Sequence, residues 1–279
     1  MNTTSAKTNA MNVSAETVTH ASDVMSSLER ALLVIPLLGG IVFGILPLFF
    51  SRQFASLLGF TGNDVYLYRL AGAVTLGYVP GLLLTILHGE WTPARLVIIA
   101  TLVFNIGSLF AVGAALLAGN AQPVVYAILA TSILIVAMTV WMLNKHRDVT
   151  RPAPDIAKWV VYLIVFLTAA AFGTGTLFLL APLQVSQLFG FMGTDQFVFR
   201  QGGAATLGFA VMGVFELRSR AWREIRLPSM NALLFNGASL LATVIAIVSG
   251  DPILLLAVVL LVTLVATIGC IMTLQRKGK

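Results

Sequence analysis

Hydrophobic residues in this chain gather into eight long runs separated by short polar segments. A helix needs about 20 mostly apolar residues to cross the roughly 30 Å hydrocarbon layer of a bilayer. Because backbone groups in lipid must find their hydrogen bonds internally, long contiguous runs favour helices over the short alternating strands of a barrel. We therefore predict an all-α integral membrane protein with eight transmembrane helices. The predicted helices are Ala31–Phe50, Tyr66–Leu87, Leu96–Ala118, Val124–Leu143, Trp159–Ala181, Phe197–Leu217, Leu227–Ser249 and Ile253–Leu274.

The composition supports a membrane location and argues against a soluble enzyme. Of the 279 residues, 58% are hydrophobic and only 10% are charged, and the mean hydropathy is +0.94. Soluble domains carry about 25% charged residues, so this chain has too little charge to cover a water-soluble surface. The net charge of +6 then reflects membrane topology rather than a nucleic-acid surface. We expect membrane lipids, and no nucleic acid, among its partners.

The positions of the basic residues predict the direction of the chain in the membrane. If the N-terminus is cytoplasmic, 14 of the 17 lysines and arginines fall in inner segments, Arg52 falls in an outer loop, and Arg69 and Arg200 lie inside spans. In membrane proteins the cytoplasmic loops carry the excess of Lys and Arg. We therefore predict a multi-pass protein of the plasma (inner) membrane with both termini in the cytoplasm.

The chain contains an internal repeat with an offset of 131 residues. Between Ser51 and Gly119, 23 of 69 positions are identical to the positions 131 residues later, without a gap. Chance overlap of apolar runs would not align charged, aromatic and amide residues in one register. The matched pairs include Asp64 with Asp195, Arg69 with Arg200, Trp91 with Trp222, Asn105 with Asn236 and Ser108 with Ser239.

The repeat divides the chain into two four-helix membrane units, residues 29–143 and residues 159–279, the second ending in a short basic tail. Residues 144–158 form a cytoplasmic linker, and residues 1–28, rich in Ser, Thr, Asn and Ala, are predicted to be a disordered polar tail. Because four is an even number of spans, both units enter the membrane in the same sense. We therefore predict two parallel repeats related by a pseudo-two-fold axis along the membrane normal.

The densest matches of the repeat lie at the outer end of the second span of each unit. A short amphipathic helix, residues 53–60 or 184–191, is followed by a turn and then by Asp64 and Arg69, or Asp195 and Arg200. The aspartates stand where an N-cap is expected, and the arginines would reach outer headgroups or loop carbonyls. The alternative is functional: the arginines would lie at an outward-facing pocket and bind an anionic lipid or substrate group.

Two polar pairs lie in the middle of predicted spans, at a spacing that places each pair on one helix face. These are Asn105 with Ser108, and Asn236 with Ser239. An amide in the membrane is costly unless it has a partner. The pairs would therefore either form hydrogen bonds between helices of one unit or line a polar cavity at the interface of the two units.

Catalytic and metal-binding patterns are missing from the sequence. It contains no HExxH, GxSxG or P-loop motif. Its single cysteine, Cys270, allows no intrachain disulfide, and none of its three histidines lies in the middle of an apolar run. Glu216 is the only acid well inside a predicted span, and we expect it to pair with Arg218–Arg223 or to lie exposed at the interface. The sequence thus predicts a protein that is not an enzyme and has no cofactor or metal.

Each unit resembles the DoxX-like four-helix bacterial membrane proteins and their relatives. The resemblance rests on an entry through an outer segment, Phe50–Gly59 or Ala181–Gly190, followed by arginine and small residues, Arg69–Gly77 or Arg200–Gly208. It covers residues 31–143 and 159–274, one copy each. The resemblance implies a four-helix fold for each unit and a link to redox-associated membrane complexes, and it assigns no catalytic residue.

Three functional hypotheses follow from these patterns. The first is a scaffold or accessory subunit that binds lipid or a hydrophobic small molecule, with a membrane-protein partner or a second copy of itself. The alternative is a transporter or channel whose path between the repeats uses Asn105, Asn236, Arg69 and Arg200. The third is a membrane enzyme that acts on lipid.

Overall fold

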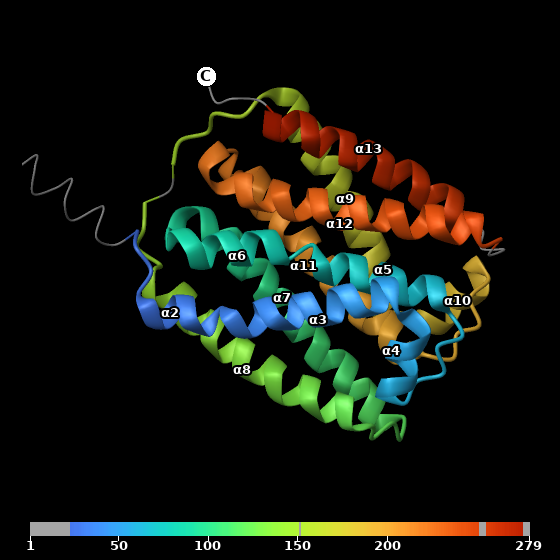
Figure 1. Cartoon of the computed structure of the whole chain (residues 1–279). Helices are drawn as coiled ribbons and strands as arrows, with labels where there is room; N and C mark the ends of the chain where they lie inside the picture. The colour runs from blue at the N-terminus through green and yellow to red at the C-terminus, as the bar shows by residue number, and fades with distance from the viewer. Residues whose placement is uncertain (1–22, 151, 251–254, 276–279) are drawn as a thin grey trace, which may run out of the picture.

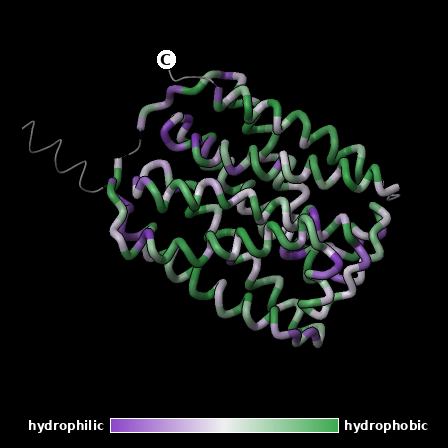
Figure 2. The backbone as a smooth tube through the Cα atoms, in the orientation of Figure 1, coloured by the Kyte–Doolittle hydropathy of each residue, from purple (hydrophilic) through white to green (hydrophobic). Residues whose placement is uncertain are grey.

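The computed structural model describes residues 23–150, 152–250 and 255–275, and the architecture of this part of the chain is all-helical (Figure 1). Its helices include eight spans long and apolar enough to cross a bilayer, two of them built from two consecutive helices. The spans are α2–α3 (Ser27–Leu32 and Val34–Phe49), α5–α6 (Val65–Leu76 and Val79–His88), α7 (Trp91–Leu117), α8 (Pro123–Lys145), α9 (Lys158–Leu180), α11 (Gln196–Ser219), α12 (Trp222–Val248) and α13 (Leu255–Gln275). The predicted all-α, eight-span membrane fold is therefore confirmed. Figure 2 shows apolar residues along the spans and polar residues gathered at their ends.

Two short helices connect the first and second spans of each half of the chain. They are α4 (Ser51–Leu58) and α10 (Pro182–Phe189), and both end at a glycine in the left-handed conformation, Gly59 and Gly190. Glycine takes this conformation without the steric cost that a Cβ brings. The short amphipathic helices expected from the sequence are therefore present.

The third span of each half begins earlier than predicted. Helices α7 and α12 start at Trp91 and Trp222, whereas the hydrophobic pattern placed their first residues at 96 and 227. The extra turns contain charged residues that pair with each other. Arg95 Nη2 of α7 lies 2.7 Å from a carboxylate oxygen of the buried Glu224 of α12. Hydropathy alone misses these turns because charge there is compensated by a partner.

The second span of the first half is broken, whereas its counterpart α11 is continuous. Pro80 has no amide hydrogen to donate to the carbonyl four residues earlier. At the break, the amide of Tyr78 donates to the carbonyl of Thr75, which is three residues earlier rather than four. The amide of Gly81, which the break leaves free, donates at 2.6 Å to the side-chain oxygen of the fully buried Asn231 on α12. A residue of the second half thus satisfies the backbone of the first.

The two halves are interlocked. Helix α5 packs against α12, and α7 packs against α11, so inner spans of each half lie on inner spans of the other. The outer spans cover this centre: α3 lies on α5, α8 on α7, α9 on α11 and α13 on α12. Figure 1 places α2 and the end of α13 on the same side of the bundle.

The end of the bundle that contains α2 is tied together by charged groups. Glu29 is fully buried, and its carboxylate accepts hydrogen bonds from Lys145 at 2.9 Å and from Ser26 while lying 2.8 Å from His146 Nε2. Because Ser26 caps α2, the polar tail predicted for residues 1–28 has its boundary too late. Residues 1–22 of that prediction lie outside the described residues.

Close helix packing depends on glycines at matched positions of the two halves. A Cβ on Gly72 would lie 2.6 Å from the carbonyl oxygen of Gly44, and a Cβ on Gly203 would lie 2.8 Å from that of Gly175. We expect Gly72→Ala and Gly203→Ala each to lower the free energy of unfolding by about 1–3 kcal/mol, because the backbones must move apart.

Thermal unfolding of the purified protein in mild detergent measures this effect. Gly113→Ala and Gly237→Ala are the matched controls, since a Cβ at either position meets nothing within 4 Å. They should leave stability unchanged or raise it by about 0.5–1 kcal/mol, the usual gain from replacing glycine inside a helix. Equal effects in all four variants would contradict the close packing.

Candidate functional site

Asp64 and Asp195 bind each other's loops. The carboxylate of Asp195 accepts hydrogen bonds from the amides of Thr61 and Gly62, at 3.1 and 3.0 Å. The carboxylate of Asp64 accepts bonds from the amides of Met192 and Gly193, at 2.6 and 3.0 Å. With the offset of 131 residues these contacts are reciprocal. We call this arrangement the loop exchange.

The loop exchange corrects the expectation that the two aspartates cap their own helices. Both occupy the N-cap position, of α5 and of α11, but neither side chain bonds to its own helix. The amides of the facing loop point into one carboxylate from a turn with a left-handed glycine, Gly62 or Gly193. Adjacent backbone amides that converge from such a turn form a binding site for an anion.

The two aspartates have different environments. Asp195 also accepts hydrogen bonds from the hydroxyls of Thr61 and Tyr68, both at 2.8 Å. Asp64 has no such hydroxyl donor among the described residues, because Phe199 stands at the position that matches Tyr68. Burial raises the pKa of the Asp64 carboxyl, since the two amide bonds do not fully offset the loss of water and the nearby charge of Asp195.

The two arginines that follow the aspartates are not part of this exchange. Arg69 and Arg200 are half-buried, and their guanidinium groups form no hydrogen bond or ion pair with any residue that the structure describes. Neither lies in the wall of the cavities described below. The structure therefore brings the aspartates together and leaves the arginines apart from them.

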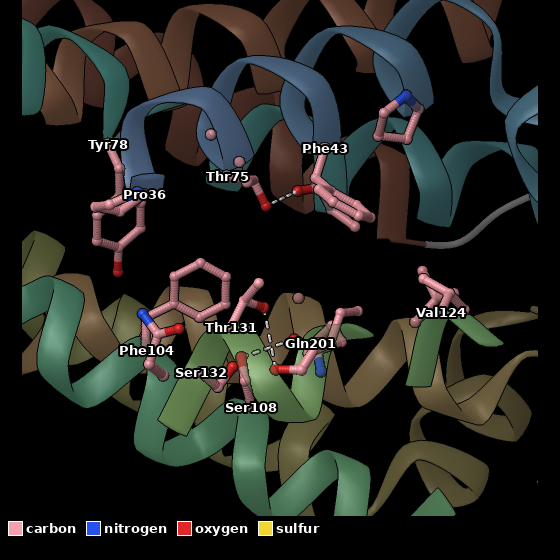
Figure 3. Close-up of a pocket in the computed structure, with 18 of the residues that line it drawn as sticks. Pro36, Phe43, Thr75, Tyr78, Phe104, Ser108, Val124, Thr131, Ser132 and Gln201 are labelled. Carbon is pink, nitrogen blue, oxygen red and sulfur yellow. Dashed lines mark hydrogen bonds between the residues drawn. The ribbon is translucent and has the colours of Figure 1, made fainter. Parts of the chain in front are cut away.

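A first cavity of about 200 Å³ lies between α3, α7 and α8 and reaches α11. Figure 3 shows Pro36 and Phe43 of α3 facing Phe104 and Ser108 across an open space. Most of its wall is apolar. Polar groups gather on one side, where Ser108 Oγ donates at 2.8 Å to the side-chain oxygen of Gln201.

A second cavity of about 430 Å³ lies at the matching place in the other half, between α9, α12 and α13 and reaching α11 and α5. Its wall contains Phe235, Asn236 and Ser239, which match Phe104, Asn105 and Ser108 of the first cavity. The two cavities come closest at α5 and α11, because Ala71 and Gly202 belong to both walls. A Cβ on Gly202 would lie 3.7 Å from that of Ala71, so the helices are in ordinary contact there.

The mid-span polar pairs do line cavities, but not one common cavity between the halves. The amides of Asn105 and Asn236 each donate to a carbonyl of their own helix, Thr101 at 2.8 Å and Ala232 at 2.7 Å, which corrects the expected bond between helices. Ser108 does bond across helices, to Gln201. Ser239 Oγ has no hydrogen-bond partner among the described residues.

The sequence also explains why Ser239 lacks the bond that Ser108 forms. Leu70 stands at the position that matches Gln201, so no amide side chain reaches Ser239. Comparing the repeats position by position would have shown this difference, although the partnership itself needs the fold.

Glu216 was expected to pair with arginines or to lie exposed, and both expectations are wrong. It is 8% exposed, lies in the wall of the second cavity and forms no ion pair within the described part of the chain. The basic residues of the same segment are engaged elsewhere: Arg218 lies over the Phe215 ring, and Arg220 donates to a backbone carbonyl. The sequence does mark Glu216 as unusual, because its counterpart 131 residues earlier is the uncharged Thr85.

Within residues 23–150, 152–250 and 255–275, no group of three or more His, Cys, Asp or Glu side chains is placed to hold a metal ion. Comparisons with protein-family models, with curated proteins and with solved structures found no match to this chain. The resemblance to DoxX-like proteins therefore remains a prediction.

We expect the two aspartates of the loop exchange to differ in their contribution to stability. In Asp195→Asn, an amide nitrogen replaces one oxygen of a carboxylate that faces four hydrogen-bond donors, which should lower the free energy of unfolding by about 2–4 kcal/mol. Asp64→Asn should lower it by about 1–2 kcal/mol, because Asp64 accepts from only two donors among the described residues. Thermal unfolding in detergent measures both, with Asp148→Asn, whose side chain is 90% exposed, as the control. An equal or larger loss in Asp64→Asn would contradict the described contacts.

The raised pKa of Asp64 predicts a pH dependence. Between the folded pKa and the ordinary value of 3.8, the folded state holds a proton that the unfolded state has released. Lowering the pH through this window therefore raises the free energy of unfolding. Above the window, the ionised Asp64 carboxylate destabilises the folded state by its full amount. From neutral pH to about pH 4, melting curves should show the natural protein gaining stability relative to Asp64→Asn. A constant difference between the two would refute the assignment.

Proposed function

We propose that this protein is a non-enzymatic membrane protein that binds a lipid chain or a hydrophobic small molecule in its two cavities. The observation that carries the proposal is the pair of apolar cavities at matched positions, each with an Asn and a Ser of the third span in its wall. Ligand sites are concave, mostly apolar and marked by a few polar groups. The second cavity has the volume of such a site, and the smaller first cavity suits part of a chain or a smaller molecule.

Access to the cavities is consistent with ligands that dissolve in the bilayer. The first cavity includes the exposed Thr131 of α8, and the second includes the exposed Thr174 of α9 and Val258 of α13. These helices form the outside of the bundle, where they would face lipid. A ligand could therefore enter sideways from the hydrocarbon layer without crossing the polar ends.

The proposal includes the membrane setting expected from the sequence. The chain would lie in the plasma membrane with both termini in the cytoplasm, as two parallel repeats. The reciprocal loop exchange supports the repeat arrangement, and the position of α2 and the end of α13 on one side of the bundle supports termini on the same face. A role as accessory subunit, as the DoxX-like resemblance implies, is compatible with a bound lipid.

The alternatives have less support. A transport path between the repeats was expected to use Arg69 and Arg200, which are outside both cavity walls. A lipid-modifying enzyme would need reactive groups beside its substrate, yet Asp64 and Asp195 are bonded to loop amides. Binding requires only the cavities.

A photoactivatable long-chain alcohol tests the proposal on the full chain in detergent or nanodiscs. Peptide mapping should find cross-links in α3 and α8 for the first cavity and in α9 and α13 for the second. Gly39→Phe should reduce labelling of the first cavity about tenfold, and the matched Ala170→Phe should do the same for the second, because each ring would fill the space. A Cβ on Gly39 meets nothing within 4 Å, so the larger residue enters open space.

Gly173→Phe serves as the control, since Gly173 is exposed on α9 and lies outside both cavity walls. It should leave both sets of cross-links unchanged. Labelling spread evenly over the outer helices, with no effect of Gly39→Phe or Ala170→Phe, would overturn the proposed function.

A further inference from the structure

The two cavities differ in charge at one position. Glu216 of α11 lies in the wall of the second cavity, one turn before the end of its span. Its counterpart Thr85 is buried, lies outside the wall of the first cavity and donates its hydroxyl at 2.7 Å to the carbonyl of Gly81. Of these two cavities, the second therefore combines an apolar interior with a carboxyl group, and the described wall of the first contains none.

The carboxyl group of Glu216 lacks a protein partner. No hydrogen bond or ion pair joins its side chain to any residue in the described ranges. Two hydroxyls in the same wall, Thr168 Oγ1 and Ser239 Oγ, are also buried without a partner. Thr168 packs directly against Gly213, one helical turn from Glu216. The wall thus offers several acceptors that the protein itself does not use.

An unpartnered acid in an apolar wall is expensive, and its natural complement is a cation. Burying a carboxylate costs several kcal/mol unless it is paired. A ligand that brings a positively charged donor would offset that cost, whereas a ligand with a carboxylate or phosphate would add repulsion. A bare metal ion is not the complement, because Glu216 is joined in this wall by Cys270 and hydroxyls but by no second acid or histidine.

We propose that the second cavity binds a lipophilic amine. The ammonium group donates to Glu216 and to the free hydroxyl of Thr168, and the apolar part lies along Leu167, Phe178 and Val259. The first cavity, which has the neutral pair Ser108 and Gln201 instead, does not distinguish an amine from an alcohol. This inference rests on the proposed function and adds a ligand class to one of its two sites.

Competition between two probes of equal length tests the inference. Dodecylamine and dodecanol are added to the full chain in nanodiscs that contain the photoactivatable alcohol, and the loss of cross-links is followed separately in each cavity. In the second cavity the amine should compete at about tenfold lower concentration than the alcohol. In the first cavity the two should compete equally.

Glu216→Gln should abolish the preference for the amine, so that dodecylamine and dodecanol compete at similar concentrations in the second cavity. Glu90→Gln, which removes an exposed acid, is the matched control for a general attraction of amines and should keep the preference. Glu216→Asp, which retains the charge, should keep part of it.

The outcomes separate the two proposals. If dodecanol fails to compete in either cavity, the proposed function is overturned. If dodecanol competes but the amine shows no preference in the second cavity of the natural protein, or keeps one in Glu216→Gln, only the amine inference is overturned. The comparison within the natural protein decides the question even if Glu216→Gln does not fold.

Discussion

Helices in a bilayer gain little from burying apolar side chains against one another, because lipid is as apolar as their neighbours. Their association must come from close backbone contact and from polar groups that lack water. In this protein, glycines provide the first, with Gly44 against α5 and Gly175 against α11. Carboxylates provide the second at both ends of the bundle, through Glu29 and Glu224 at one end and the loop exchange at the other.

These packing contacts explain where the two cavities lie. The second spans of the two halves, α5 and α11, are held tightly by α3 and α9 and by the third span of the opposite half. The first span of each half packs mainly on the second span, and the fourth span packs mainly on the third. Cavities therefore form between first and fourth spans, next to the third span that carries Asn and Ser. The same scaffold then tolerates different chemistry in the two cavities, since Gln201 and Glu216 each have an apolar or neutral counterpart.

The sequence was sufficient for the architecture and insufficient for the partnerships. Apolar runs predicted eight spans because the requirement for internal backbone bonds acts locally. The register of the repeat identified Asp64, Asn105 and their counterparts as positions of interest. It did not show that Asp64 bonds to the loop of the other half, because that contact joins residues about 130 positions apart. The hydrogen bonds between helices expected of Asn105 and Asn236, and the arginine partner expected of Glu216, were wrong for the same reason: an isolated span does not reveal which neighbour, if any, supplies a partner.

The loop exchange makes each half of the chain depend on the other. An isolated half would have an aspartate without its amide donors and an outer loop without its carboxylate. Because one polypeptide contains both halves, the contact forms at an effective concentration that does not depend on how much protein is present. The two sides of the exchange need not be identical either, since Tyr68 donates to Asp195 whereas Phe199 stands at the matching position beside Asp64.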